Sequence, residues 1–480
     1  MKIKQPDILF ATVPYTDTDM PLMAPAILKS IAEKAGKTSV CVDLNLKLIK
    51  YIQDHEYKYE LLNFFHDGVT IPEIEQELYD LLESYAKILL AYSPRIIALS
   101  VFTYNCQIAA KYISYFIKKL SPATHIILGG NGIRENLAGK AKFAIDLLDS
   151  GLINFYILGD GEKVLYDYLT SSKSDINGIN SNKWDQLSNQ DLSELPPPNY
   201  DDYNMEEYSA KMIPILGSRG CVRQCSFCDI HVHWSKFSFR SGQHIFDEMI
   251  TLSQKYDIYN FKFQDSLING NLREYRSLMK LIADYNNNSV PEKKFNWTGL
   301  FILRTIDTFK EEDWRLTAEG GGKWLGVGVE TLSDSARFHL GKKFTNADIE
   351  FSLQMAKKYN VPLILLFLIG YVTETEQDID YAVKWWEDHV EYKDILQVNL
   401  GSPLGILKET PLEKQFIELK LERVGPHDHD WINPQTDNTP VKRVEWYNRL
   451  SATLERLGFI EHKPTDNHFI MERMMRDFNK

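Results

Sequence analysis

Residues 1–170 alternate short apolar runs with stretches whose apolar positions recur at helical spacing. Residues 23–35 and 105–120 predict amphipathic helices, and residues 45–92 predict a mostly helical insertion. The runs that predict buried strands are residues 7–13, 38–42, 96–100, 125–128 and 155–158. Strands that alternate with helices favour a parallel sheet, so we expect a Rossmann-like (flavodoxin-like) α/β domain here.

A polar segment separates this domain from the rest of the chain. Residues 171–208 are rich in Ser, Asn and Asp and contain three consecutive prolines, which is typical of a linker. The runs that predict strands beyond it are residues 213–216, 259–263, 295–303, 324–329, 363–369 and 395–399. With helical stretches between them, these runs predict a partial (β/α)6 TIM barrel over residues 209–411, with functional residues at the carboxyl ends of its strands. Residues 412–480 predict a small α-rich C-terminal extension.

Composition and charge narrow the functional classes. The 480-residue chain is 44% hydrophobic, 12% aromatic and 25% charged, with a formal net charge of −12. This acidic charge argues against a nucleic-acid surface over the whole protein, although a local basic patch would survive it. The most apolar run, residues 361–370, has the length of a strand, so we expect no membrane span. The N-terminus lacks the apolar stretch of a signal peptide, which favours a cytoplasmic location.

Three of the five cysteines lie in one short segment. Cys221, Cys225 and Cys228 directly follow the strand predicted at residues 213–216. Three thiolates at this spacing can hold three corners of a cubane iron–sulfur cluster. No fourth cysteine lies nearby, so one iron would stay open for another ligand. The other two cysteines are expected to be buried in the N-terminal domain.

This cysteine segment allows a second interpretation. With His231 or His233 as the fourth ligand, it has the ligand chemistry of a Cys3His zinc site, and the chain would be a zinc-stapled binding protein. Structural zinc usually staples small, loop-rich modules, whereas this segment opens an array of six βα units. Phe227, just before the last cysteine, offers a ring against which an adenine can lie. These points favour the cluster.

The pattern C-x-x-x-C-x-Φ-C after a first barrel strand, with Φ aromatic, resembles the signature of the radical S-adenosylmethionine (SAM) superfamily. The resemblance implies that Cys221, Cys225 and Cys228 hold a [4Fe–4S] cluster whose open iron chelates the amino and carboxylate groups of SAM. It also implies that one electron splits SAM to give a 5′-deoxyadenosyl radical. A flavodoxin- or ferredoxin-type protein would supply that electron.

Further segments of the expected barrel resemble the SAM-binding parts of this superfamily. They lie at strand ends, where acids or amides would contact the SAM amino group, an arginine would pair with its carboxylate, and glycines would flank its adenine. The residues expected to bind SAM are Phe227, Gln264, Asp265, Arg304, Gly328, Glu330 and Gly370. An acid at the end of a strand is often only a helix N-cap, and a single arginine is often only an exposed ion-pair partner. The interpretation as a SAM site therefore depends on the order in which these segments follow one another along the chain. No catalytic residue is assigned.

The N-terminal domain resembles the cobalamin (B12)-binding domain of one branch of the superfamily, which includes class B-type methyltransferases. The segments that carry this resemblance are residues 100–130, 159–162 and 194–201. The residues expected to bind cobalamin are Ser100, Gly129, Gly130, Gly159 and Glu162. The loop after the first strand, residues 15–21, has no histidine, so cobalamin would be held without a protein imidazole on cobalt. A flavodoxin-like domain that serves packing or substrate binding remains the alternative.

Together these resemblances imply methyl transfer from methylcobalamin to an unactivated carbon of a small-molecule or peptide substrate. An enclosed barrel mouth would keep the radical away from water. Cobalamin-independent radical rearrangement, oxidation or bond formation is the alternative within the same chemistry. The zinc-stapled, non-catalytic protein is the alternative from another class, and modification of RNA is disfavoured by the acidic charge.

Overall fold

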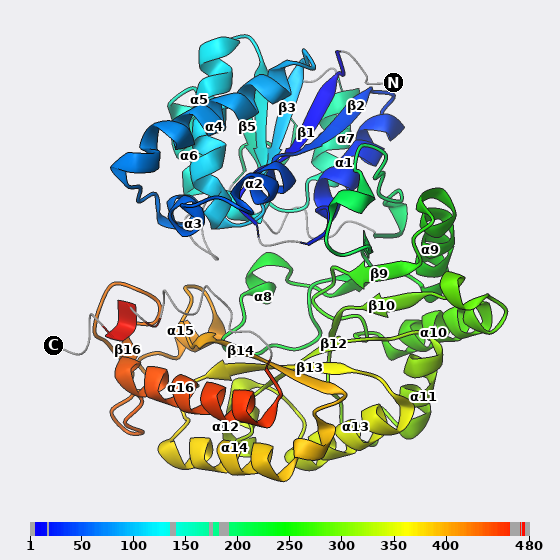
Figure 1. Cartoon of the computed structure of the whole chain (residues 1–480), viewed down its shortest axis with the longest axis vertical. Coiled ribbons are helices and arrows are strands. Elements are labelled where there is room, and N and C mark those ends of the chain that lie inside the picture. Colours follow the sequence, from blue (N-terminus) through cyan, green and yellow to red (C-terminus); the bar gives the residue numbers. More distant parts are fainter. Residues whose placement is uncertain are drawn as a thin grey trace. The chain divides into compact units, whose positions relative to one another are not determined.

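Two units make up the chain in the computed structural model (Figure 1). One comprises residues 1–215 with 233–238, and the other residues 216–232 with 239–480. The structure describes residues 5–16, 19–134, 141–171, 176–181, 192–460, 471 and 473–475. Both units are α/β with parallel sheets, which confirms the predicted fold class. The finer division into segments 1–170, 171–208, 209–411 and 412–480 stays a prediction.

The first unit is built on a parallel sheet of five strands in the order β2-β1-β3-β4-β5. The strands are β1 (Ile8–Thr12), β2 (Ser39–Asp43), β3 (Ile96–Ser100), β4 (His125–Gly129) and β5 (Phe155–Ile157). This is the flavodoxin-like doubly wound order, in which ligands bind outside the carboxyl ends of the strands, where the order reverses. The five strands lie where the apolar runs predicted them.

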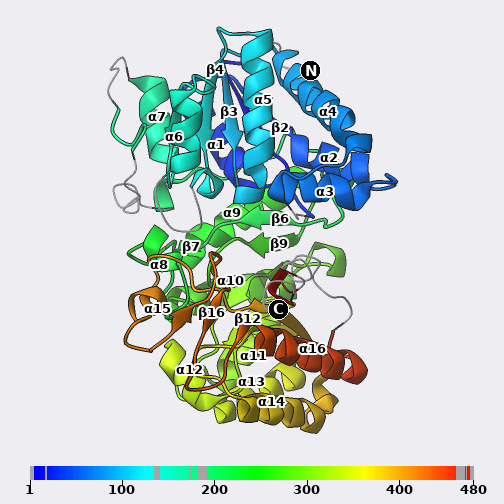
Figure 2. The ribbon, with the colours of Figure 1, turned by 90° about the vertical axis from the view of Figure 1, so that its left-hand side faces the viewer.

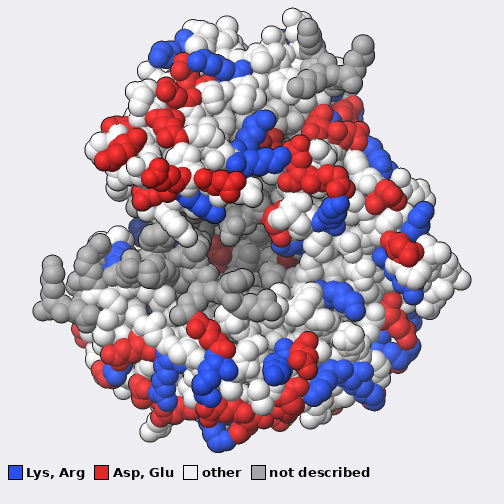
Figure 3. Space-filling view, viewed as in Figure 1, with Lys and Arg blue, Asp and Glu red and all other residues white. Residues whose placement is uncertain are grey.

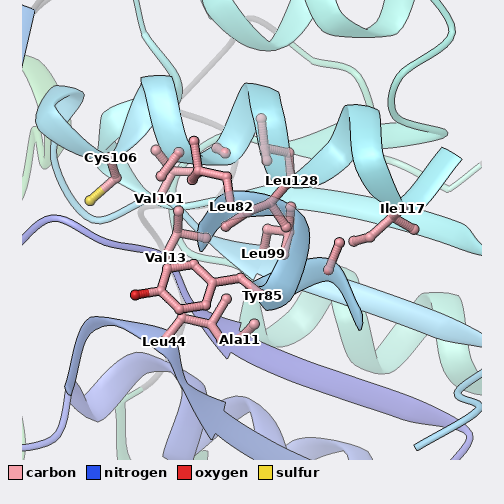
Figure 4. Packing of buried hydrophobic residues seen from close by; sticks show 14 of the residues in the cluster. Ala11, Val13, Leu44, Leu82, Tyr85, Leu99, Val101, Cys106, Ile117 and Leu128 are labelled. Atoms are coloured by element: carbon pink, nitrogen blue, oxygen red, sulfur yellow. The ribbon is translucent and has the colours of Figure 1, made fainter. Parts of the chain in front are cut away.

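Helices cover the faces of this sheet (Figure 2). The helices are α1 (Met23–Lys34), α2 (Leu44–Ile52), α3 (Lys58–Asp67), α4 (Pro72–Leu90), α5 (Gln107–Leu120), α6 (Lys142–Asp149) and α7 (Glu162–Thr170). Helix α1 packs against α7, and α4 packs against α5. Figure 4 shows Leu82 and Tyr85 of α4 against Leu99 and Leu128 of the sheet, all of them buried. The insertion predicted at residues 45–92 is therefore helical and closes this core.

The described part of the expected linker is bound to the first unit. Lys29, buried in α1, forms an ion pair with Asp202. The Tyr208 hydroxyl donates to Asp43 Oδ2 at 2.7 Å, at the end of β2. Residues 192–208 thus pack on the rest of the first unit through part-buried polar contacts; the stretches 172–175 and 182–191 of the expected linker lie outside the described residues.

Parallel strands also form a three-stranded sheet, β10-β9-β6, and a four-stranded sheet, β11-β12-β13-β14. The strands are β6 (Ile213–Ile215), β9 (Asn260–Phe263), β10 (Asn296–Thr298), β11 (Leu300–Phe301), β12 (Leu325–Glu330), β13 (Leu363–Ile369) and β14 (Leu396–Pro403). The run predicted as one strand over residues 295–303 forms two, because β10 pairs with β9 whereas β11 pairs with β12. The chain changes sheets at Gly299, between the two strands.

Helices follow these strands and lie around the outside of the sheets in Figure 1. They are α9 (Gly242–Tyr256), α10 (Leu272–Asn287), α11 (Glu311–Glu319), α13 (Asn346–Tyr359) and α14 (Glu376–Asp388). The C-terminal helix α16 (Pro440–Leu457) packs on α14. Shorter elements are β7 (Ser218–Arg219), α8 (Ile230–His233), β8 (Ser238–Phe239), α12 (Asp334–Leu340), α15 (Pro411–Lys414), β15 (Glu422–Arg423) and β16 (Trp431–Ile432).

The face of the molecule seen in Figure 3 mixes acidic and basic side chains. On the second unit, Arg449 of α16 forms ion pairs with Glu376 and Asp380 of α14. Within the described part of the chain, no helix combines the length and the apolar character needed to cross a membrane.

Candidate functional site

The loop that carries the three cysteines begins after β6 and is held by the end of β9. The N–H of Gly217 donates to Asp265 Oδ2 at 2.9 Å, and the Ser218 hydroxyl donates to the carbonyl of Leu267 at 3.0 Å. Asp265 is only 3% exposed. Burial raises the pKa of Asp265 to about 7, although hydrogen bonds from Ser218 and Gly217 act against this rise. The end of β9 thus fixes where the cysteine loop starts.

A buried ion pair supports the same segment. Arg240 Nη2 lies 2.7 Å from Glu248 Oε2, and both side chains are almost inaccessible to solvent. Arg240 Nη1 donates to the carbonyl of Leu216, and its backbone N–H donates to that of Gly217, each at 2.8 Å. Removing either partner of such a pair leaves an uncompensated buried charge, so the pair is a strong constraint on the residues that precede the first cysteine.

The middle of the loop is tied to α12, to α15 and to Tyr371 through Ser226. Its N–H donates to the carbonyl of Leu340 in α12 at 2.9 Å, and its own carbonyl accepts from the N–H of Leu412 in α15 at 2.7 Å. Its hydroxyl lies 2.7 Å from the hydroxyl of Tyr371, which lies 2.9 Å from Nδ1 of His339. The backbone between the second and third cysteines is therefore held from both sides.

The three thiols are free and differ in exposure. Cys225 is buried in an apolar cluster that includes Leu340, whereas Cys221 and Cys228 are partly exposed. Burial raises the pKa of all three thiols, and that of Cys228 to about 12. The N–H of Arg223 donates to Cys221 Sγ at 3.3 Å, so backbone donors already point at a sulfur of this loop.

Among the described residues, no group of three or more His, Cys, Asp or Glu side chains is placed so that it could hold a single metal ion. Zinc at about 2.3 Å from each thiolate would bring its sulfurs to about 3.8 Å from one another, whereas a cubane spreads its three thiolates more widely. The two histidines considered as zinc ligands have other partners. His231 Nε2 donates to the carbonyl of Arg223, and the ring nitrogens of His233 lie 2.9 Å from the guanidinium of Arg134. The donor set fits an iron–sulfur cluster better than zinc.

A second buried ion pair lies at the end of β12. Lys342 Nζ is 2.9 Å from Glu330 Oε1 and donates to the carbonyl of Gly328 at 2.8 Å. A Cβ at Gly328 would lie 2.4 Å from Glu330 Oε1, so only glycine leaves room for the pair. Burial alone would lower the pKa of Lys342, but the Glu330 carboxylate and the thiols of Cys225 and Cys221 raise it overall.

Two arginines near the loop have no acidic partner in the described part of the chain. Arg304 Nη2 donates to the carbonyls of Asn269 and Gly270 at 2.8 and 2.9 Å. Burial lowers the pKa of Arg304, and the neighbouring guanidinium groups of Arg223 and Arg276 lower it further. Arg304 and Arg223 are thus close cations that can receive a carboxylate.

The other residues expected to bind SAM have different surroundings. Gln264 is exposed, and Phe227 is half-buried against the apolar cluster around Cys225. Gly370 has a φ of 75°, and a Cβ there would lie 2.3 Å from Cγ of Arg443. The packing of Arg443 therefore requires this glycine, whether or not a ligand is near. The assignment of these residues to a SAM site stays a prediction.

Three residues that contact or flank the loop had no role in the sequence analysis: Ser226, Lys342 and Tyr371. The sequence signal for Lys342 is its place next to Gly341, which has a φ of 98° and packs on the loop. No local signal exists for Tyr371, because its contact with Ser226 joins residues 145 positions apart.

The residues expected to bind cobalamin lie along the carboxyl edge of the sheet in the first unit. Thr12, Ser100 and Gly129 align in register at the ends of β1, β3 and β4. A Cβ at Gly129 would meet one backbone atom, at the ordinary contact distance of 3.7 Å. Gly130 has a φ of 106°, and a Cβ there would lie 2.4 Å from the carbonyl oxygen of Val101. Gly130 is thus required by the packing of two loops, whereas Gly129 leaves open space.

The loops after β4 and β5 also hold residues 233–238. Arg134, 3% exposed, contacts His233, and Trp234 Nε1 donates to the Asp160 carboxylate at 3.3 Å. Gly159, beside Asp160, has a φ of 96°, and Glu162 is buried in the first turn of α7.

The same edge carries groups that a ligand would satisfy. Thr12 Oγ1 and Asn105 Oδ1 are buried and have no hydrogen-bond partner among the described residues. Ser100 is partly exposed, and the ring of Phe102 is 45% exposed. Buried polar groups are normally paired, so these atoms, together with the space at Gly129, fit a large ligand over the edge.

The cysteine loop lies in a part of the chain that matches a known protein family. Residues 215–385, which include the cysteine loop, match the Radical SAM superfamily. An uncharacterised methyltransferase of Pyrococcus horikoshii is 22% identical over 336 residues, which are 67% of this chain and 69% of that protein. Cytidylyl-2-hydroxyethylphosphonate methyltransferase of Streptomyces wedmorensis is 30% identical over 216 residues, which are 40% of this chain and 39% of that protein.

Comparison with solved structures covers almost the whole chain. The radical SAM methyltransferase TsrM of Kitasatospora setae, with tryptophan and a SAM analogue bound, gives a TM-score of 0.66 at 15% identity over 98% of this chain and 96% of that one. Its structure with cobalamin and a [4Fe–4S] cluster gives 0.65 at 15% identity over 98% and 95%. A likeness at this identity shows a shared fold, and it confirms the predicted one. Residues 215–385, with the cysteine loop near their N-terminal end, are thus similar to the domain of the radical SAM superfamily, which supports a [4Fe–4S] cluster and SAM as the cofactors of this site.

Proposed function

We propose that this chain is a cobalamin-dependent radical SAM methyltransferase that methylates a carbon of a small-molecule or peptide substrate. The observation that carries the proposal is the cysteine loop at the end of β6, fixed by β9, α12 and α15. The methyltransferase relatives support it, as does the fold shared with TsrM, which has been solved with cobalamin and the cluster. When bound, the cluster and SAM supply the radical, and cobalamin supplies the methyl group.

In this proposal Cys221, Cys225 and Cys228 hold the cluster. Arg304 and Arg223 receive the SAM carboxylate, because both are cations without an acidic partner in the described residues. The acids Asp265 and Glu330 lie on the amino-group side of SAM. The remaining residues of the proposed SAM site are Phe227, Gln264, Gly328 and Gly370.

The proposed cobalamin site is the carboxyl edge of the first sheet. Ser100 and Gly129 line it, and the packing of Gly130 on Val101 shapes the loop beside it. Gly159 and Glu162 belong to the neighbouring loop after β5. The buried hydroxyl of Thr12 has no hydrogen-bond partner among the described residues. It supports a ligand at this edge, because leaving a buried donor unpaired costs free energy.

The chemistry also needs a substrate and a reductant. We propose a flavodoxin- or ferredoxin-type electron donor and a cytoplasmic location. The cysteines support this location, since none of the five forms a disulfide and thiols stay reduced in such a compartment.

The experiment is metal analysis after anaerobic reconstitution with iron, sulfide and hydroxocobalamin, followed by desalting. We expect about four irons and one cobalt per chain, the content of one cubane and one corrinoid. Reductant and SAM should then give 5′-deoxyadenosine. Iron without cobalt would contradict the methyltransferase proposal and indicate cobalamin-independent radical chemistry. Zinc without iron would contradict the cluster itself.

A further inference from the structure

A buried cation lies against the cysteine loop. The side chains of Lys342 and Glu330 are only 12% and 14% exposed, and they form an ion pair at 2.9 Å. Burying two charges is expensive unless geometry and further hydrogen bonds compensate. Here the carbonyl of Gly328 provides a further acceptor for the Lys342 ammonium. The chain thus has a lysine at a position where an apolar side chain would avoid the free-energy cost of burying a charge.

Backbone contacts place the turn that carries this cation against the loop. Gly341, directly before Lys342, is so close that a Cβ would lie 3.0 Å from the carbonyl oxygen of Gln224 and 3.5 Å from Cα of Cys225. One residue earlier, the carbonyl of Leu340 accepts the N–H of Ser226. The turn that carries Lys342 is therefore in direct contact with the loop between the first and third cysteines.

We propose that Lys342 is the electrostatic partner of the cluster and raises its reduction potential, with Glu330 as the counter-charge that holds the ammonium in place. The inference rests on the proposed function only for the cluster on the three cysteines, and it is independent of cobalamin and methyl transfer. One-electron reduction of the cluster by an external low-potential donor adds one negative charge. A fixed positive charge in a poorly solvated site stabilises the reduced state, and net charge is one of the factors that set cluster potentials.

The hydrogen bonds of Lys342 favour this electrostatic role over a role in binding the SAM carboxylate. An ammonium has three donors, and two of them are directed to Glu330 and to the carbonyl of Gly328. Arg223 and Arg304, which lie near each other, have no acidic partner in the described part of the chain and are better placed to receive a carboxylate.

The experiment is an EPR-monitored redox titration of the reconstituted full-length protein without SAM, with dithionite as reductant. Iron per chain is measured first. Lys342→Met should disfavour reduction about tenfold, which is a fall of 59 mV for a one-electron couple. Lys342→Arg keeps the charge and should stay near the wild-type potential. Glu330→Gln removes a negative charge and should raise the potential.

The matched control is Lys343→Met, because Lys343 is the next residue, carries the same charge and is exposed. Its potential should equal that of the wild type. A full cluster in Lys342→Met with the wild-type potential, or an equal fall in Lys343→Met, would overturn the inference. If Lys342→Met does not take up iron, Glu330→Gln is the variant that tests the inference. An unchanged or lower reduction potential in Glu330→Gln also overturns the inference. A wild-type protein without a cluster would instead refute the proposed function.

Discussion

The carboxyl edges of the two parallel-sheet systems are built differently. At the end of β6, the cysteine loop is held by side chains from elsewhere in the chain, through Asp265, Arg240 and Tyr371. At the edge of the first sheet, the loops pack backbone on backbone, and Gly130 makes that contact possible. The first place carries the Lys342–Glu330 ion pair at the end of β12, whereas at the second the strand ends themselves carry uncharged groups such as Thr12 and Ser100.

This difference follows from the kind of ligand that each edge is proposed to hold. A cluster forms bonds to three thiolates, so the geometry of a few atoms must be fixed, and buried hydrogen bonds and ion pairs fix it. A corrinoid would be held over a wide surface, where shape matters more than any single bond. The cysteine loop therefore leaves a specific sequence pattern, whereas the first edge leaves mainly glycines, which any doubly wound fold can contain.

The largest effect is expected from removing one thiol of the loop. Cys225→Ala should abolish cluster assembly and the formation of 5′-deoxyadenosine, because two thiolates cannot hold the cubane. Iron per chain and the visible absorption of the cluster measure this loss. Cys41→Ala is the control, since Cys41 is buried in the first unit and should leave iron content unchanged. Full iron and SAM cleavage in Cys225→Ala would show that the ligands lie elsewhere.

Two adjacent glycines can separate packing from ligand binding at the first edge. Gly130→Ala should destabilise the protein by about 3 kcal/mol, because the position combines a positive φ with a clash against Val101. Gly129→Leu should fold normally, within about 1 kcal/mol, but should prevent cobalamin uptake while leaving iron content unchanged. Urea unfolding and cobalt per chain are the measurements. Normal cobalt content in Gly129→Leu would place the corrinoid elsewhere or exclude it.

The same contrast explains what the sequence could predict. Strands and helices were predicted well, because apolar spacing is a local signal, and the loop was found because three cysteines lie within eight residues. The division of residues 295–303 into β10 and β11 was missed, since the change of pairing partner at Gly299 depends on neighbouring strands. Tyr371 was missed for a similar reason, because its partner Ser226 is remote in sequence.

A smaller, pH-dependent effect is expected at a buried carboxyl of the second unit. Glu374 is 4% exposed, and burial raises its pKa to about 7, although hydrogen bonds from Thr331 and Tyr371 oppose the rise. The unfolded chain ionises near the ordinary pKa of about 4.3. Between these values the unfolded state binds fewer protons, so this group makes stability fall as pH rises, and the loss is complete above pH 7.

Glu374→Gln should remove this fall of the free energy of unfolding with rising pH. We expect the variant to gain stability relative to the wild type, by about 2 kcal/mol, on going from pH 5 to pH 8. Urea unfolding followed by tryptophan fluorescence measures this, because seven of the nine tryptophans lie in the second unit. Glu376→Gln is the control, since its side chain is exposed on α14. Parallel pH profiles for Glu374→Gln and the wild type would refute the raised pKa.

The smallest effect concerns two buried tyrosine hydroxyls, one in each unit. The Tyr371 hydroxyl lies within hydrogen-bond distance of Ser226 and His339, whereas the Tyr85 hydroxyl has no partner among the described residues. Tyr371→Phe should therefore cost about 1 kcal/mol and release iron faster to a chelator. Tyr85→Phe should be neutral or slightly stabilising by circular dichroism, because it removes an unsatisfied buried group. Equal effects of the two substitutions would mean that the hydrogen bonds of Tyr371 do not hold the cysteine loop.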